Sequence, residues 1–242
     1  MNNEYDNEKF FEEYAKMSRS KNGLSAAGEW HLLKPMFPQL KGKNVLDLGC
    51  GYGWHCKFAA MQGAERVLGI DSSEKMIEQA KRRNSDVKTE YRICRIEEYG
   101  YPEDTWDCVV SNLALHYIDD IAEVFQNVRK TLKTGGVFIF NIEHPVFTAG
   151  VSQDWIYSEE GEPLYWPIDD YFVSGERHTR FLGCDVVKRH HTLTQILKGL
   201  LDNGFELLAV EEATPPKEMA DLPEMKNELR RPMMLLVKAA KK

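Results

Sequence analysis

A glycine-rich turn behind a short apolar run constrains the fold of this chain more than any other feature of its sequence. Residues 45–54 read VLDLGCGYGW, with Gly49, Gly51 and Gly53 at alternate positions and one acid, Asp47, inside the apolar run. The run predicts a buried strand, and the segment after the glycines predicts a helix. Glycine adopts positive φ easily and lets a backbone approach a ligand closely. The segment therefore predicts a strand, a ligand-binding turn and a helix.

Strand and helix patterns alternate through the residues that follow. Expected strands cover residues 44–49, 66–71, 87–96, 106–114 and 136–143, and expected helices cover 54–64, 72–84 and 121–136. Ser72 or Ser73 suits the N-cap of the second of these helices, and glycine suits the end of the third. This alternation is typical of βαβ units and predicts a mostly parallel sheet with helices on both faces. Such sheets bind their ligands at the carboxyl ends of the strands.

The flanking segments predict a cap and a lid. Residues 4–20 have helical periodicity, and a short helix within 29–43 ends at its prolines. Residues 143–190 break the alternation and are rich in aromatics, prolines and acids, with a hairpin turn expected at Ser174–Gly175. A connection of this length in a compact domain is usually a lid or a binding loop. The expected parts are an N-terminal helical cap (1–40), a ligand-binding core (41–142), a lid insertion (143–190) and a C-terminal helix with strands that complete the core (191–242).

Length and composition limit the class of protein. The length of 242 residues fits one domain with an insertion. The net charge of −7 argues against a nucleic-acid partner. No window approaches the about 18 apolar residues that a membrane span needs, and the acidic, polar start is unlike a secretory or transit peptide. We therefore expect a cytoplasmic protein with no membrane partner. The five cysteines form no CxxC pair, so neither a metal site nor a disulfide framework is expected.

The spacing of the glycines and a nearby acid limit the ligand of the turn. A dinucleotide site uses the pattern GxGxxG, whereas this turn has GxGxG and places Trp54 where the third glycine is expected. Asp47 would repel a pyrophosphate but would pair with an ammonium group. Asp71 ends the second strand, at a spacing where an acid can accept hydrogen bonds from both ribose hydroxyls. A ligand with an ammonium group and no phosphate fits best, and a nicotinamide-dependent oxidoreductase is the rival.

At VLDLGCGYG the sequence resembles the first motif of the class I S-adenosylmethionine-dependent methyltransferases, and GIDSSEKMIEQA resembles their second. The likeness covers residues 40–142, and the later segments EHPVF and RPMMLLVKA are similar to bacterial small-molecule methyltransferases of the type 11 group. It implies a Rossmann-like, doubly wound α/β fold whose seven-stranded, mostly parallel sheet has an antiparallel last strand, with a lid insertion after the fifth strand. It also implies S-adenosylmethionine as the cofactor, S-adenosylhomocysteine as its product, and an enzyme of class EC 2.1.1.-.

The resemblance assigns most of the cofactor contacts. It places Asp47 at the amino-acid end of the cofactor, Met76 against the adenine, and Ile96 where a backbone N–H meets the adenine ring. Arg95 stands where relatives commonly have an aspartate, so either Glu97 compensates for it or backbone and packing alone hold the adenine. The expected contacts are Asp47, Gly49, Cys50, Gly51, Gly53, Asp71, Ser72, Met76, Ile96, Glu97, Asn112 and Leu113, the last two lining the methionine portion.

Two histidines are candidates for a catalytic role at the same edge of the sheet. Methyl transfer from a sulfonium is an in-line displacement, in which positioning matters most and a base is needed only for an acceptor that carries a proton. His116 lies four residues after Asn112, and His144 directly follows the fifth strand. Each could act as a general base or position the acceptor, and each could instead be a hydrogen-bonded structural histidine.

Two segments bear on the nature of the methyl acceptor, one after the fourth strand and one in the insertion. SNLALH, after the fourth strand, is not the Asn-Pro-Pro-Tyr type of motif that accompanies methylation of base amino groups. The aromatics of residues 155–172 suit either a closed pocket for a small molecule or the core of the lid itself. We expect methylation of an oxygen or nitrogen atom of a small metabolite. The alternatives are a tRNA or rRNA methyltransferase, which would need a basic patch around AKRRN, and a non-catalytic protein that binds S-adenosylmethionine; no pattern specifies an oligomeric state.

Overall fold

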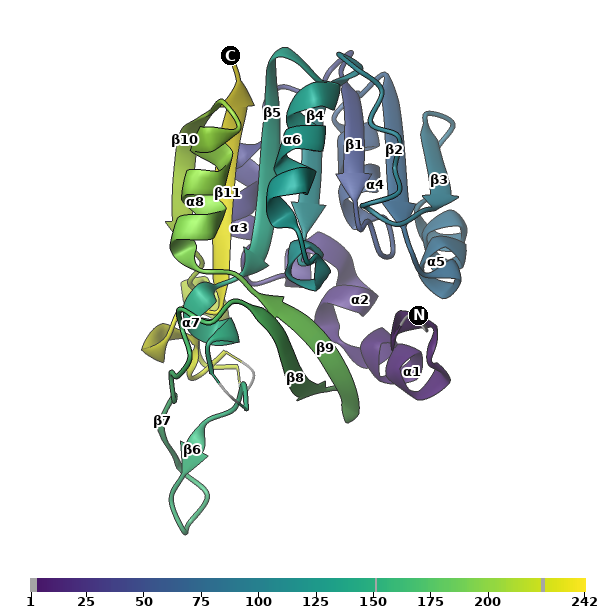
Figure 1. Cartoon of the computed structure of the whole chain (residues 1–242). Helices are drawn as coiled ribbons and strands as arrows, with labels where there is room; N and C mark the ends of the chain where they lie inside the picture. Colours follow the sequence, from purple (N-terminus) through teal and green to yellow (C-terminus); the bar gives the residue numbers. More distant parts are fainter. Residues whose placement is uncertain (1–3, 151, 223–224) are drawn as a thin grey trace.

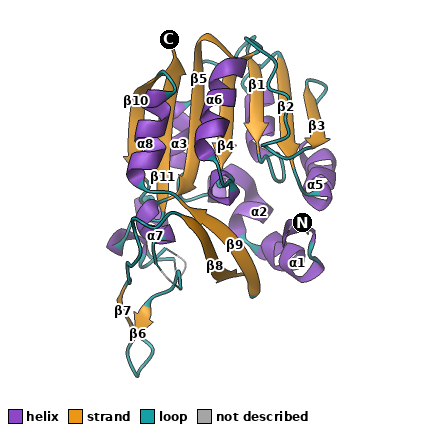
Figure 2. Cartoon of the chain, viewed as in Figure 1, coloured by secondary structure: helices purple, strands orange, loops and turns teal. Residues whose placement is uncertain are grey.

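A seven-stranded sheet forms the centre of the computed structural model, which describes residues 4–150, 152–222 and 225–242 (Figures 1 and 2). In spatial order its strands are β10 (Phe205–Glu212), β11 (Met234–Lys241), β5 (Leu132–Glu143), β4 (Trp106–Asn112), β1 (Asn44–Leu48), β2 (Arg66–Asp71) and β3 (Thr89–Ile93). The pairs among β5, β4, β1, β2 and β3 are parallel, and β11 pairs antiparallel with both β5 and β10. The prediction of a mostly parallel, doubly wound sheet with an antiparallel last strand is confirmed.

Helices cover both faces of the sheet and bury a separate hydrophobic core on each (Figure 2). On one face lie α6 (Ile121–Thr131) and α8 (Leu193–Asp202), and on the other lie α3 (Trp30–Leu33), α4 (Trp54–Met61) and α5 (Glu74–Asn84). The strands between them are mostly apolar runs, as expected for strands that are buried on both faces. Polar residues at the carboxyl ends of these strands are exceptions to that pattern, and they mark the edge at which a ligand can bind.

Capping residues set the ends of the helices, and one predicted end is wrong. Ser73 caps α5, its Oγ accepting the Met76 N–H at 3.1 Å, so the N-cap is Ser73 and not Ser72. Helix α6 ends at Thr131 and not at the glycines, because Leu132 has an extended backbone and begins β5. Among the described residues, no helix is long and apolar enough to cross a membrane.

The N-terminal segment forms three short helical pieces instead of the single helix expected over residues 4–20. A 3₁₀ turn at Glu4–Asp6 precedes α1 (Glu8–Lys16) and α2 (Ser18–Asn22). Met17 separates the two helices because its backbone is extended, with φ −58° and ψ 144°. The three pieces lie beside the carboxyl edge of the sheet (Figure 1).

The segment between β5 and α8 folds into small elements that extend from the same edge (Figure 1). They are α7 (Pro145–Thr148), β6 (Ile156–Tyr157), β7 (Pro163–Tyr165), β8 (Gly175–Phe181) and β9 (Cys184–His190). The β8–β9 hairpin turns at Leu182 and Gly183, which have positive φ values of 52° and 73°, so the turn predicted at Ser174–Gly175 is wrong. The β6–β7 pair forms an arm that points away from the sheet, whereas β8 and β9 lie under its carboxyl edge (Figure 1).

Candidate active site

The glycine turn has the backbone conformation that its sequence predicts. Gly49, Gly51 and Gly53 have φ values of 74°, 52° and 75°, a region that other residues seldom adopt. A Cβ at Gly49 would lie 2.3 Å from the Ala114 Cβ, and one at Gly53 would lie 2.3 Å from the Tyr91 hydroxyl oxygen. At Gly51, by contrast, no atom of the described residues lies within 4 Å of a Cβ position. The outer two glycines therefore allow close packing, and Gly51 borders open space in which a ligand can lie.

Asp71, at the end of β2, fixes the turn from the neighbouring strand. Its carboxylate accepts the backbone N–H of Gly51 and that of Ser73, each at 2.9 Å. Burial raises the pKa of Asp71 to about 6, although the same two backbone donors oppose the rise. The Asp71 carboxylate thus lies beside the open position in the turn, next to the exposed Ser72.

Asp47 is a buried carboxylate with unused hydrogen-bonding capacity. Its side chain is 1 % exposed, and its Oδ2 accepts the Cys56 thiol at 3.3 Å, while Cys50 packs with Cys56 against Gly69. No residue in the described part of the chain donates a hydrogen bond to its Oδ1. Burial raises the pKa of Asp47 to about 7, more than the Cys56 thiol lowers it. Because a buried acceptor without a partner is costly, this oxygen favours a ligand that brings a donor.

A second buried polar group, which the sequence analysis does not predict, lies at the carboxyl ends of β4 and β5. Asn141 of β5 donates through Nδ2 to the Asn112 Oδ1 at 2.9 Å and to the Glu29 Oε1 at 3.5 Å. Glu29 is 2 % exposed and forms an ion pair with Arg19. Burial raises the pKa of Glu29, but the Arg19 charge and hydrogen bonds outweigh burial and the net shift is downward. Neither Glu29 Oε2 nor Asn141 Oδ1 has a hydrogen-bond partner within residues 4–150, 152–222 and 225–242.

The remaining expected contacts lie along the same edge. Ile96, shortly after β3, and Met76, in the first turn of α5, are both buried. The Glu97 carboxylate lies 3.1 Å from the Arg95 guanidinium, and both side chains are partly exposed. Leu113, directly after β4, has a φ of 56°, a conformation that is strained for a leucine. Strain of this kind is often found at functional sites.

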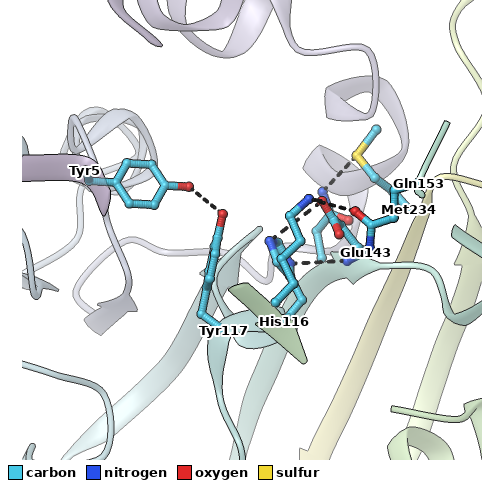
Figure 3. Close-up of polar contacts among 8 residues, drawn as sticks. Tyr5, His116, Tyr117, Glu143, Gln153 and Met234 are labelled. Atoms are coloured by element: carbon cyan, nitrogen blue, oxygen red, sulfur yellow. Dashed lines mark hydrogen bonds and ion pairs between the residues drawn. The ribbon is translucent and has the colours of Figure 1, made fainter. Parts of the chain in front are cut away.

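His116 lies in a 3₁₀ turn after β4 and contacts the end of β5 (Figure 3). Its Nδ1 accepts the backbone N–H of Glu143 at 3.5 Å, and its Nε2 lies 3.8 Å from the Glu143 Oε1. Burial lowers the pKa of His116 to about 4, more than the Glu143 charge raises it. The ring is therefore neutral near pH 7 and, because Nδ1 accepts, it carries its proton on Nε2.

His144 has the contacts of a structural residue. Its Nδ1 accepts the backbone N–H of Val146 at 3.0 Å at the start of α7, and its Nε2 lies 3.0 Å from the Glu212 Oε1 of β10. Burial lowers the pKa of His144 against the opposing effect of Glu212. The two histidines thus contact different carboxylates, and in the described ranges no group of His, Cys, Asp or Glu is arranged to hold a metal ion.

The N-terminal pieces and the insertion meet over this edge of the sheet. The Tyr5 hydroxyl lies 3.0 Å from that of Tyr117, which follows His116 (Figure 3). The rings of Phe10 in α1 and Phe181 in β8 are 5.8 Å apart and join the two covering segments. The side chains beneath are consequently shielded from solvent.

Two tryptophans of the insertion pack on one another. The rings of Trp155 and Trp166 pack edge to face at 5.4 Å, and the Arg231 guanidinium lies 4.4 Å from the centre of the Trp166 ring. These contacts form a small core inside the insertion. Other aromatics of this segment are exposed, namely Tyr157, Tyr165 and Phe172. For Trp155 and Trp166 this packing agrees with the second of the two alternatives, in which the aromatics form the core of the lid itself.

Known proteins are similar to this chain over its core, and some are similar over most of its length. A family model for a methyltransferase domain matches residues 46–140. A solved structure from Listeria monocytogenes, of a protein assigned to the S-adenosylmethionine dependent methyltransferases, is 50 % identical, with 91 % of this chain and 100 % of that chain covered and a TM-score of 0.86. An S-adenosylmethionine dependent methyltransferase from Mesorhizobium loti is 41 % identical, with coverages of 90 % and 100 % and a TM-score of 0.83. An uncharacterised protein of Haemophilus influenzae is 30 % identical over 100 % of this chain and 99 % of its own length.

Fold, site and relatives together define an enzyme that transfers methyl groups. More particularly, this chain belongs to the S-adenosylmethionine-dependent methyltransferases, and S-adenosylmethionine is its cofactor. The residues present fit that cofactor. Gly51 borders open space, and the unpaired Oδ1 of Asp47 is an acceptor for its ammonium group.

Proposed function

We propose that this methyltransferase acts on an oxygen or nitrogen atom of a small metabolite, held at the carboxyl ends of β4 and β5. The observation that carries the proposal is the closure of this edge, where His116 and Glu143 are buried beneath β9 and the N-terminal pieces, and Lys188 of β9 is itself buried and pairs with Glu143. A folded RNA or protein would have to displace both covers to reach these groups, whereas a small molecule needs only a local opening.

The methionine end of the cofactor is proposed to bind between β1, β4 and β5. Three buried acceptors without partners among the described residues support this place: Asp47 Oδ1, Glu29 Oε2 and Asn141 Oδ1. An ammonium group has three N–H donors and would satisfy such acceptors. Arg19, which is already paired with Glu29, offers a positive charge for the cofactor carboxylate. A zwitterionic ligand would thus meet groups of both charges.

The adenosine end is proposed to extend from Asp71 towards β3. Asp71 is suited to accept the ribose hydroxyls because its carboxylate already lies beside Gly51. Ile96 and Met76 would then pack against the adenine. Glu97 is less suited to bind the adenine amino group, since Arg95 engages its carboxylate at 3.1 Å. We therefore favour backbone and packing contacts for the adenine.

The N-terminal cap (residues 1–40) and the insertion (residues 143–190) are proposed to open and close over the site. Asp6 accepts the Ser73 hydroxyl at 2.6 Å and so ties the cap to the start of α5. The Tyr5–Tyr117 contact at 3.0 Å, the Arg83–Ser20 bond at 3.0 Å and the Asn141–Glu29 bond at 3.5 Å also join the cap to the core, and contacts of this kind would have to break when the cap opens for a ligand.

Of the two candidate histidines, His116 is proposed to position the acceptor through its Nε2–H. His144 is less suited to this role, because its two ring nitrogens contact Val146 in α7 and Glu212 in β10. A substitution His116→Gln should therefore impair methyl transfer more than His144→Gln, and initial rates with both variants would measure the difference.

The proposed function is tested by the nature of the methylated product. The purified enzyme is incubated with a cell extract and S-adenosylmethionine labelled in its methyl group, and the products are sorted by size and by sensitivity to nuclease and protease. We expect label in small molecules that neither treatment changes. Label confined to RNA or protein would contradict the proposal.

The RNA alternative has little support in the basic cluster of α5. Arg83, although exposed, is engaged within the protein, since it donates to the Ser20 carbonyl at 3.0 Å and lies 4.9 Å from the centre of the Tyr52 ring. The cluster therefore presents fewer free charges than its sequence suggests, in a chain whose net charge is −7.

A further inference from the structure

Glu143, at the end of β5, carries a carboxylate oxygen that none of the proposed roles uses. The side chain is 7 % exposed, and its Oε1 accepts the Lys188 ammonium at 2.5 Å. Its Oε2 is buried, and no donor from the described segments of the chain reaches it. A buried carboxylate oxygen left without a donor is costly, so its presence favours a functional role.

Lys188 of β9 holds this carboxylate in place. It is 4 % exposed, its Nζ also donates to the Gln153 Oε1 at 3.3 Å, and the charge lies 5.7 Å and 5.3 Å from the ring centres of Phe147 and Phe181. Gln153 contributes to this arrangement from a backbone with a φ of 48°, which is unfavourable for a non-glycine residue. A buried ion pair is weak support for stability compared with apolar packing, so the pair also favours a functional role.

His116 is poorly arranged to take a proton beside this pair (Figure 3). Its Nδ1 already accepts the Glu143 backbone N–H at 3.5 Å. Its Nε2 carries the ring proton and lies 3.8 Å from the Glu143 Oε1. The Nδ1 lone pair is therefore already used and Nε2 is protonated, so the neutral ring has no free lone pair for the proton of the acceptor, whereas the Glu143 Oε2 has lone pairs available.

We propose that Glu143 Oε2 accepts the proton of the methyl acceptor, which makes that acceptor a hydroxyl or an amine and not a carboxylate. This inference rests on the proposed function and names the substrate class of the same site. Charge agrees with it, because Glu143 already neutralises Lys188, so a carboxylate acceptor would meet the like charge of Glu143 in a buried place. Glu143 is then a catalytic residue, and Lys188, which acts through it, is a positioning residue.

The step balances in atoms and charge. A lone pair on the acceptor oxygen or nitrogen forms a bond to the methyl carbon, while the bond from that carbon to the sulfonium sulfur breaks with both electrons remaining on sulfur. The acceptor O–H or N–H bond breaks, and its proton passes to the Glu143 Oε2 and from there to water. General-base assistance of this kind contributes about 10²–10⁴-fold to a rate.

The test uses variants that separate the proton acceptor from the ion pair. Glu143→Gln keeps the shape of the side chain but leaves Lys188 buried without a counter-charge, so Glu143→Gln/Lys188→Met, which removes both charges, is the second variant. The matched control is Glu206→Gln, on the exposed side of β10, where the carboxylate lies 3.6 Å from the Lys242 ammonium. Methyl-labelled S-adenosylmethionine and a small-metabolite extract serve as probes. Products are sorted into base-labile esters and base-stable ethers and amines.

We expect base-stable label with the wild type and with Glu206→Gln, and incorporation at least about 100-fold slower in both Glu143 variants. S-adenosylhomocysteine affinity, measured by calorimetry, should stay within about twofold in all of them, since Glu143 lies on the acceptor side. Label in base-labile products would overturn the proposal. Equal incorporation by the wild type and both Glu143 variants would also overturn it, and so would a lack of incorporation by all three. Label in RNA or protein would contradict the proposed function instead, so the two failures are distinguishable.

Discussion

Asp71 accepts the Gly51 backbone N–H at 2.9 Å, and this hydrogen bond joins the end of β2 to the glycine that borders open space. The same carboxylate accepts the Ser73 N–H at 2.9 Å, next to the start of α5. The acid, the turn and the helix are thus fixed relative to one another without a ligand. Such preorganisation lowers the entropic cost of binding.

Replacing Gly51 with alanine should weaken S-adenosylhomocysteine binding more than it weakens the fold. A Cβ there meets no described atom within 4 Å but stands where we place the ligand, and a φ of 52° costs an L-residue about 1 kcal/mol. Gly42→Ala is the matched control, because its φ is 73° and its surroundings are equally open. The melting temperatures of the two variants should fall by similar amounts. Gly51→Ala alone should bind S-adenosylhomocysteine about tenfold or more weakly by calorimetry. Equal affinities would argue against this place for the cofactor.

Gly53→Ala should act on the fold instead. The added Cβ would lie 2.3 Å from the Tyr91 hydroxyl oxygen, so the ring or the turn must move, at a cost of about 1–3 kcal/mol. Urea unfolding should show this loss of stability. The double variant Gly53→Ala/Tyr91→Leu should recover part of the lost stability. Equal stabilities of the single and the double variant would show that the contact with Tyr91 is not the cause of the loss.

Cofactor binding should depend on pH through Asp47. Burial raises its pKa to about 7, so the free protein holds a proton there at lower pH. An ammonium group favours the ionised carboxylate, so binding releases the proton, and affinity should rise as the pH increases towards 7 and level off above it. The contribution to stability has the opposite sign. An acid whose folded pKa is raised stabilises the fold most below its unfolded pKa of about 3.9, and that contribution is lost as the pH rises through about 7.

Calorimetric titrations in buffers of different ionisation enthalpy would count the released proton. Asp47→Asn should abolish most of the dependence, leaving the smaller contribution of Asp71, whose pKa burial raises to about 6. An unchanged pH profile in Asp47→Asn would show that another group titrates.

Arg19→Met should destabilise the protein by about 3 kcal/mol, because it leaves the Glu29 carboxylate buried without its counter-charge. Arg19→Met/Glu29→Leu removes both charges and should recover most of that loss, while S-adenosylhomocysteine binding stays weak. Urea unfolding and calorimetry on the two variants would check this. Recovery of binding in the double variant would exclude both residues from the cofactor site.

The core of the fold could be predicted from the sequence because local patterns determine it. The apolar runs of β1 and β5 need burial on both faces, and helices with capping residues such as Ser73 separate the strands. Where local signals were ambiguous, the prediction failed. Ser174–Gly175 looked like a turn, but the hairpin turns at Leu182–Gly183, where a leucine adopts positive φ.

The candidate site could be predicted only for residues whose positions are fixed by their spacing from the glycine turn. Asp47 and Asp71 have characteristic places relative to the glycine turn, so their positions followed from spacing. Glu29 and Glu143 meet their partners only through the tertiary fold. Glu29 accepts a hydrogen bond from Asn141, which is 112 residues away in the sequence, and Glu143 accepts one from Lys188, which is 45 residues away. The polar residues inside the apolar run of β5 were the available signal, but a sequence does not show which partners such residues meet.

Calorimetric titration with S-adenosylhomocysteine shows whether the glycine turn and Asp71 hold the cofactor, when the wild type is compared with Asp71→Asn and with the surface control Asp202→Asn. Asp202 is exposed and contacts Lys198 in the same helix, so its substitution should leave binding unchanged. We expect that the wild type binds and that Asp71→Asn binds about 10–100-fold more weakly, because hydrogen bonds to a charged group are lost. Absence of binding by the wild type, or equal affinity of Asp71→Asn, would contradict it.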